Sequence, residues 1–289
     1  RDFIEKETGA LDGFYRSVQT RAKGMDKETE RQSFLTNLYD TFFKTAFPKT
    51  ADRLGIVYTP VELVDFLIKS ADAILREEFS SSLADEDVVI LEPFTGTGTF
   101  LSRLMHIIPP EKLKDKYNKE IWGNEILLLP YYIALANIES TYYEITGEHK
   151  PFDGLVLTDS FQLMEDEGTA DSQLFPEKYT ESLRKQKQAK INVIISNPPW
   201  YSRQEMEGMN NQNLKYEKLD EKIQKTYAAH TTVTLKNALY DSYIRAIRLA
   251  TDRIEDKGVI AFVTNNGFID RNLTAGLRKY LAEEFCKVY

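Results

Sequence analysis

Five short apolar runs limit what this chain can fold into more than any other feature of its sequence. These runs are residues 88–91, 121–123, 155–157, 193–195 and 259–263. They are apolar without alternation, and segments with helical periodicity separate them. Strands that are apolar on both sides are typical of a parallel sheet with helices on both faces. The sequence therefore predicts an α/β fold, a doubly wound and mostly parallel sheet of the Rossmann-like kind.

The first part of the chain has a different pattern. Apolar residues between Phe34 and Phe47 keep helical spacing until Pro48 closes the run. We predict a helical N-terminal cap over residues 1–54 and an α/β core over residues 55–289. The chain starts without methionine, and its last residues look like the beginning of a strand. We therefore expect a piece of a longer protein, with a core that is C-terminally incomplete.

A further helix is expected directly after Tyr58. Thr59 fits the N-cap position, Pro60 the first helical position and Glu62 the capping-box partner. The apolar residues from Val61 onward keep to one face of this helix, which predicts that the helix packs against the sheet.

Composition excludes several classes of protein. No window has the roughly 18 apolar residues that a membrane span needs, and the start lacks a signal peptide, so we expect no membrane partner. Cys286 is the single cysteine, which excludes an internal disulfide and favours a cytoplasmic location. The three histidines lack metal-ligand spacing, so we expect no metal site. A net charge of −8 argues against a domain that holds nucleic acid unaided.

A glycine-rich turn follows the first apolar run. It reads Glu92-Pro-Phe-Thr-Gly96-Thr-Gly98-Thr-Phe100, and its glycines allow a tight turn in which the backbone approaches a ligand before the next helix. No Gly-Lys-Ser/Thr follows, so the turn is not a phosphate-binding Walker loop. An ordinary tight connection between a strand and a helix would also fit this pattern.

Acidic residues follow the second and third runs. Glu125 could accept hydrogen bonds from both ribose hydroxyls of a nucleoside-like cofactor, or could simply occupy a helix N-terminus. Asp159 could bind an adenine amino group, with the Phe161 ring beside the base. Taken alone, this third motif fits a helix cap better than a ligand site.

The fourth run leads directly into Asn197-Pro198-Pro199-Trp200. The two prolines cannot continue a central strand or donate backbone hydrogen bonds, so the turn is rigid. The Asn197 amide oxygen and the Pro198 carbonyl then become fixed acceptors. Two acceptors that take hydrogen bonds from a planar amino group pull on its protons. This frees the nitrogen lone pair for attack on a methyl sulfonium. Trp200 offers a flat face on which an extruded base could stack.

The order of these motifs resembles that of the amino-methyltransferases, and specifically the gamma-class DNA adenine methyltransferases. Residues 55–60 resemble their N-terminal cofactor motif. The resemblance implies S-adenosylmethionine as cofactor, with Thr59 and Gly96 near its methionine moiety, Glu125 on the ribose and Asp159 on the adenine. Ser160, between Asp159 and Phe161, departs from the simplest Asp-Phe form of the family.

The resemblance also sorts the candidate site residues by role. The predicted cofactor-binding residues are Tyr58, Thr59, Glu92, Gly96, Gly98, Phe100, Glu125, Asp159 and Phe161. The predicted catalytic residues, which engage a target adenine flipped out of double-stranded DNA, are Asn197, Pro198, Pro199 and Trp200.

A more specific resemblance covers the later part of the chain. Residues 227–230, 236–248 and 258–269 resemble the methyltransferase region of Type ISP restriction-modification enzymes. Those enzymes are single chains that combine a nuclease, a helicase-like translocase, a methyltransferase and a target-recognition domain. The resemblance implies duplex DNA and the further domains of a parent chain as partners.

Other functions stay open at this stage. A protein-glutamine methyltransferase can use the same tetrapeptide on a side-chain amide, and a cytosine amino-methyltransferase is chemically close. A catalytically silent cofactor-binding module of a DNA translocase is a third alternative, although Asn197 is present. Methylation of a cytosine ring carbon would need a cysteine nucleophile, and Cys286 lies far from any catalytic turn.

Overall fold

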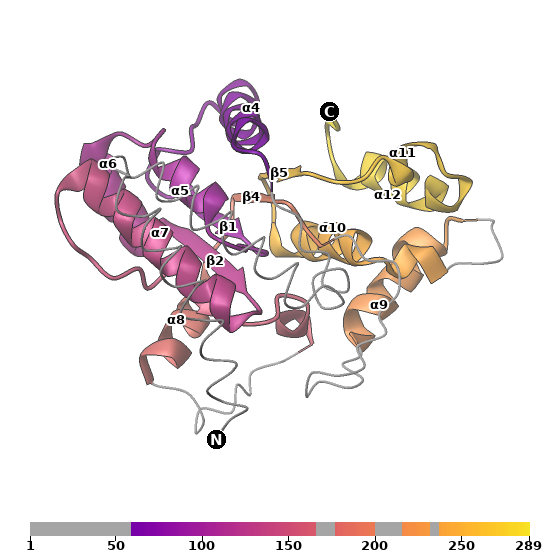
Figure 1. Ribbon diagram of the computed structural model, residues 1–289. Helices are drawn as coiled ribbons and strands as arrows, with labels where there is room; N and C mark the ends of the chain where they lie inside the picture. Colours follow the sequence, from indigo (N-terminus) through magenta and orange to yellow (C-terminus); the bar gives the residue numbers. More distant parts are fainter. Residues whose placement is uncertain (1–58, 166–176, 200–215, 232–236) are drawn as a thin grey trace, which may run out of the picture. The chain divides into compact units, whose positions relative to one another are not determined.

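The computed structural model describes residues 59–165, 177–199, 216–231 and 237–289 (Figure 1). The chain divides into two units, Arg1–Phe47 and Pro48–Tyr289, and the described residues belong to the second. The predicted helical cap over residues 1–54 therefore lies outside the described residues, as do Tyr58 and Trp200.

Each of the five apolar runs forms a strand of one sheet. The strands are β1 (Ile90–Glu92), β2 (Ile121–Glu125), β3 (Leu155–Leu157), β4 (Val193–Ser196) and β5 (Val259–Phe262). Their order is β3-β2-β1-β4-β5, and every neighbouring pair is parallel. The predicted doubly wound parallel sheet is confirmed.

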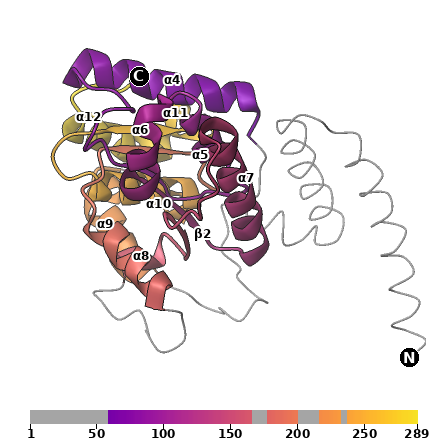
Figure 2. The ribbon, with the colours of Figure 1, turned by 90° about the vertical axis from the view of Figure 1, so that its left-hand side faces the viewer.

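Helices cover both faces of this sheet, as the apolar strands require (Figure 1). On one face lie α4 (Val61–Phe79), α5 (Thr99–Met105) and α7 (Leu128–Thr146), and on the other lie α8 (Glu177–Gln188) and α10 (Ser242–Arg253). Ile90 packs into the core on the first face, while the next residue, Leu91, packs on the second against Ala250 of α10. Figure 2 shows α4 and α8 on opposite sides of the sheet.

Shorter helices complete the described part of the chain. They are α6 (Pro110–Asp115), η1 (Lys116–Glu120), η2 (Gln162–Met164), α9 (Glu217–Ile223), η3 (Gln224–Ala228), η4 (Asn237–Tyr240), α11 (Gly267–Asp270), η5 (Asn272–Thr274) and α12 (Ala275–Glu284). A second apolar cluster joins η3, α10 and α12 around Tyr227, Ile244 and Leu277. None of the described helices is both long and apolar enough to span a membrane.

The start of α4 differs from the prediction. The helix begins at Val61, with Pro60 as its N-cap, and the Pro60 carbonyl accepts the first backbone hydrogen bonds. The predicted capping box of Thr59 and Glu62 is therefore wrong. Thr59 is instead buried, and its hydroxyl pairs with the side chain of Asn197 at the end of β4.

Candidate functional site

The predicted motifs come together at the carboxyl edge of the sheet. The strands are parallel, so the segments that follow β1, β2, β3 and β4 all leave the sheet on this side. The order of strands reverses between β1 and β4, and ligands of open α/β sheets bind at such a switch point. The glycine turn after β1 therefore lies beside the Asn-Pro-Pro turn after β4.

The glycine turn requires its two glycines for different reasons. Both have positive φ angles, 58° at Gly96 and 83° at Gly98, which favour glycine. A Cβ on Gly98 would lie 3.1 Å from the Cα of Ala134, so this glycine lets α7 pack closely against the turn. A Cβ on Gly96 would meet nothing within 4 Å, so this side of the turn is open among the residues present.

Two buried carboxyl groups flank the turn. Glu125 accepts hydrogen bonds from the backbone N–H of Gly96 at 2.8 Å and of Leu127 at 2.7 Å. Burial raises the pKa of Glu125 to about 7, although these hydrogen bonds oppose the shift. Glu92 is 1% exposed, and burial together with the charge of Glu125 holds its pKa well above the usual range. Its Oε2 atom has no hydrogen-bond partner among the described residues.

Asp159 caps the turn that follows β3. Its Oδ1 accepts the backbone N–H groups of Phe161 and Gln162, which is the helix cap that the sequence left open. Its Oδ2 accepts the hydroxyl of Tyr216 at 2.7 Å. Burial raises the pKa of Asp159, and the bond from Tyr216 opposes that shift. The Phe161 ring is buried between Phe94 and Tyr216, with ring centroids 5.2 and 5.3 Å away.

Tyr216 could not be found from the sequence because it belongs to no motif. Ser160 was missed for another reason, since in the sequence it is visible only as a departure from the family pattern. Ser160 is buried, donates to the Pro93 carbonyl at 2.6 Å and accepts from the Asn124 amide at 3.0 Å. Ser160 therefore joins the ends of β1, β2 and β3. Its departure from the Asp-Phe pattern of the family was the one sign of this role in the sequence.

Asn197, at the end of β4, is held by a hydrogen bond to Thr59. Its Nδ2 donates to the Thr59 hydroxyl at 2.8 Å, and its Oδ1 is buried without a hydrogen-bond partner among the described residues. Pro198 is buried and Pro199 is half-buried. The turn thus presents a buried acceptor without a partner in the described part of the chain, and its role toward a target base stays a prediction.

Phe100 lies in the core, and Trp200 is one of the predicted site residues that the structure does not describe. The Phe100 side chain is buried in the main core beneath the glycine turn, together with Leu101 and Leu104. Trp200, the predicted stacking residue, lies outside the described residues. No cluster of His, Cys, Asp or Glu suited to a metal ion occurs within the described ranges.

Comparison with known families settles the class of this site. A family model described as N-6 DNA Methylase matches residues 30–287. The chain belongs to the N-6 DNA methylase family. The predicted resemblance to DNA adenine methyltransferases is thereby confirmed, and the chain is a methyltransferase domain that uses a methyl donor. No curated protein sequence matches it.

Solved structures give the same answer in more detail. A DrdV–DNA complex is 38% identical with a TM-score of 0.87, and the match covers 97% of this chain and 27% of that one. The Type ISP restriction-modification enzyme LlaBIII bound to DNA is 46% identical with a TM-score of 0.84, over 96% and 19% of the two chains. A nuclease-deletion mutant of the Type ISP enzyme LlaGI with a DNA substrate mimic is 43% identical with a TM-score of 0.83, over 96% and 23%.

The likeness to Type ISP enzymes that the sequence predicted is confirmed by the LlaBIII and LlaGI matches. The chain nevertheless spans only 19–27% of the length of these three relatives.

Proposed function

We propose that this chain is the methyl-transfer core of a DNA adenine methyltransferase that forms part of a larger restriction-modification enzyme. The observation that carries the proposal is the Asn197 amide oxygen, a buried acceptor with no partner among the described residues, on the turn next to the glycine turn. Family membership supplies the reaction class, and this acceptor supplies a place for the amino group that receives the methyl.

The residues around the glycine turn fit S-adenosylmethionine as the methyl donor. The open side of Gly96 admits the ligand close to the backbone. Glu125 keeps lone pairs beyond its two backbone bonds, with which it can accept the ribose hydroxyls. Glu92 has a buried oxygen beside the same turn that lacks a hydrogen-bond partner within the described ranges. When bound, this cofactor supplies a methyl group on a positively charged sulfur.

The remaining cofactor roles follow from the family resemblance. Thr59 lies beside Asn197 at the end of β4, and the methionine moiety is expected near it. Asp159 is the expected partner of the cofactor adenine, and Tyr216 fixes its carboxylate. Gly98 contributes through the turn that it makes possible. We also retain the cofactor-binding roles that the family resemblance implies for Tyr58, Phe161 and Phe100.

The target base is engaged on the β4 side of the crevice. Asn197 Oδ1 and the Pro198 carbonyl accept the two protons of the adenine amino group, and Trp200 stacks on the base after it leaves the duplex. These acceptors polarise the N–H bonds toward the nitrogen and reduce delocalisation of its lone pair into the ring, which makes the lone pair available. The methyl group that bound S-adenosylmethionine would supply would pass to this nitrogen, S-adenosylhomocysteine would leave, and the nitrogen would lose one proton to solvent. No covalent enzyme intermediate is needed.

Recognition of DNA is assigned to further parts of a parent chain. A net charge of −8 gives this domain an unfavourable long-range interaction with duplex phosphate, so other domains must contribute affinity. The division into a cap over residues 1–54 and a core over residues 55–289 belongs to the same proposal. Nuclease, helicase-like and target-recognition domains are the expected companions.

Product analysis tests the proposal directly. The full-length protein is incubated with DNA and methyl-labelled S-adenosylmethionine, and the DNA is digested to nucleosides. We expect label in N6-methyladenine, whereas label in N4-methylcytosine or in protein glutamine would support the alternative enzymes. Asn197→Ala should lower turnover by about 10²–10³-fold, as loss of one fixed hydrogen-bonding group does elsewhere. Its affinity for S-adenosylhomocysteine should stay within about twofold, since the role proposed for the Asn197 side chain is toward the target base and not the cofactor. Absence of transfer by the unaltered protein would support a silent module.

A further inference from the structure

We infer that Thr59 is a positioning residue for Asn197, which holds the amide so that its oxygen faces the target amino group. The inference rests on the proposed function of Asn197. It assigns the Thr59 hydroxyl a task other than capping α4, and leaves the cofactor contact proposed above to the parts of the residue that Thr59→Val keeps.

The contact joins two rigid elements. The Asn197 Nδ2 atom donates to the Thr59 hydroxyl at 2.8 Å, although the two residues are 138 positions apart. Thr59 is 9% exposed, and it directly precedes Pro60, the N-cap of α4, which packs against β5 and β4. Asn197 follows β4 directly and is succeeded by two prolines. Neither side chain therefore depends on a surface loop for its place.

The chemistry of an amide explains why this contact matters. An amide presents an acceptor at one end and donors at the other, and the adenine amino group offers only donors along its N–H bonds. The amide oxygen must therefore face the target, which turns the amide nitrogen inward. An inward N–H without a partner would be a buried unsatisfied donor. The Thr59 hydroxyl accepts this N–H and leaves Oδ1 open, as the structure shows among its described residues.

The test separates positioning from cofactor binding. Thr59→Val keeps the shape of the side chain and removes the hydroxyl, while Thr59→Ser keeps the hydroxyl. In the full-length protein we expect Val to lower kcat about tenfold, the effect of losing one buried hydrogen bond and leaving its donor unpaired. Ser should restore kcat to within about threefold, and S-adenosylhomocysteine affinity should stay within about twofold in both variants.

A matched control comes from Thr231, another buried threonine whose hydroxyl donates to the Leu273 carbonyl at 2.8 Å. Thr231→Val should lower thermal stability and leave kcat unchanged. If Thr59→Val weakens S-adenosylhomocysteine binding and spares kcat, Thr59 serves the cofactor and the inference is overturned. The inference is also overturned if Ser fails to restore kcat, or if Val has full activity. An Asn197→Ala variant that keeps its turnover would instead overturn the proposed function itself.

Discussion

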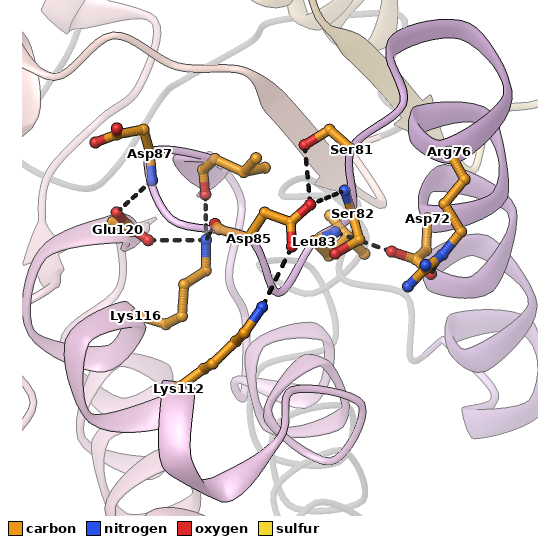
Figure 3. Close-up of polar contacts among 11 residues, drawn as sticks. Asp72, Arg76, Ser81, Ser82, Leu83, Asp85, Asp87, Lys112, Lys116 and Glu120 are labelled. Atoms are coloured by element: carbon orange, nitrogen blue, oxygen red, sulfur yellow. Dashed lines mark hydrogen bonds and ion pairs between the residues drawn. The ribbon is translucent and has the colours of Figure 1, made fainter.

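The two edges of the sheet use buried polar groups in opposite ways. At the amino edge, ahead of β1 and β2, the ammonium of Lys116 is buried and donates to the carbonyls of Asp85 and Val88 (Figure 3). It also forms an ion pair with Glu120 at 2.9 Å, and Glu120 accepts the backbone N–H of Asp87. Each of these charged groups has a partner, which for Glu120 Oε2 is the ion pair with Lys116 and not a hydrogen bond.

At the carboxyl edge, several buried acceptors are left open. Glu92 Oε2, Asn124 Oδ1 and Asn197 Oδ1 have no hydrogen-bond partner among the described residues. A buried polar group without a partner costs about 1–3 kcal/mol of stability, so this edge is the less stable arrangement. The same sheet therefore has paired buried charges at one edge and, at the edge where the ligand sites are proposed, buried acceptors without partners in the described part of the chain.

The largest effect is expected at the amino edge. Lys116→Met should lower the free energy of unfolding by about 3–5 kcal/mol, because it leaves the Glu120 carboxylate buried and unpaired. Urea unfolding measures this loss. The folded variant should bind S-adenosylhomocysteine as the unaltered chain does, since the cluster lies at the opposite edge from the cofactor motifs.

A neighbouring lysine provides the control. Lys112 pairs with Asp85 at 3.3 Å, and about half of its side chain is exposed. Lys112→Met should therefore cost about 0–1 kcal/mol. If the two variants lose equal stability, burial does not distinguish the Lys116 cluster and the contrast between the edges fails.

The next effect concerns cofactor affinity at the carboxyl edge. Glu125→Ala should raise the dissociation constant of S-adenosylhomocysteine about tenfold or more, since a hydrogen bond to a charged group contributes about 1.5–3 kcal/mol. Calorimetry measures this change. Glu165 also accepts two backbone N–H groups but lies outside the predicted site, so Glu165→Ala should lower stability and spare affinity. Equal affinities in the two variants would contradict the ribose role.

The raised pKa of Glu125 gives a third, pH-dependent prediction. With a folded pKa of about 7, the group binds more protons in the folded than in the unfolded chain, so its contribution to stability is full below the unfolded pKa and is lost as pH rises through 7. The ionised carboxylate of Glu125 accepts hydrogen bonds with both oxygens, whereas the protonated form carries an O–H donor. Because the ribose role needs the ionised form, affinity for S-adenosylhomocysteine should rise about tenfold from pH 6 to pH 8.

These opposite trends are measured by thermal melts and calorimetry on the same samples. Glu125→Gln cannot titrate and should flatten both pH profiles. Profiles that stay as steep in this variant would show that another group titrates.

The smallest effect is expected at Tyr216. Tyr216→Phe removes the hydroxyl that Asp159 accepts and should weaken S-adenosylhomocysteine binding by about three- to tenfold. If Asp159 contacts the cofactor adenine, an analogue whose adenine amino group is replaced by oxygen should lose much less affinity in this variant. An equal loss for both ligands would assign Tyr216 to packing with Phe161.

The sequence by itself determined the sheet and the edge that carries the site. Continuous apolar runs become buried parallel strands because nothing along them favours exposure of either face, and all five formed where they were predicted. Motifs that follow parallel strands then share one edge by geometry alone. The tight turn at Gly96 and Gly98 could also be predicted from the sequence, because positive φ angles favour glycine.

Only the tertiary structure decided which polar groups pair across that edge. Thr59 has good capping chemistry, yet its hydroxyl meets Asn197 because α4 packs over β4 and buries the residue that precedes it. Tyr216 reaches Asp159 from 57 residues away, and Ser160 reaches the Pro93 carbonyl from 67. Such hydrogen bonds leave no local pattern in a sequence, because their geometry exists only after the helices have packed on the sheet.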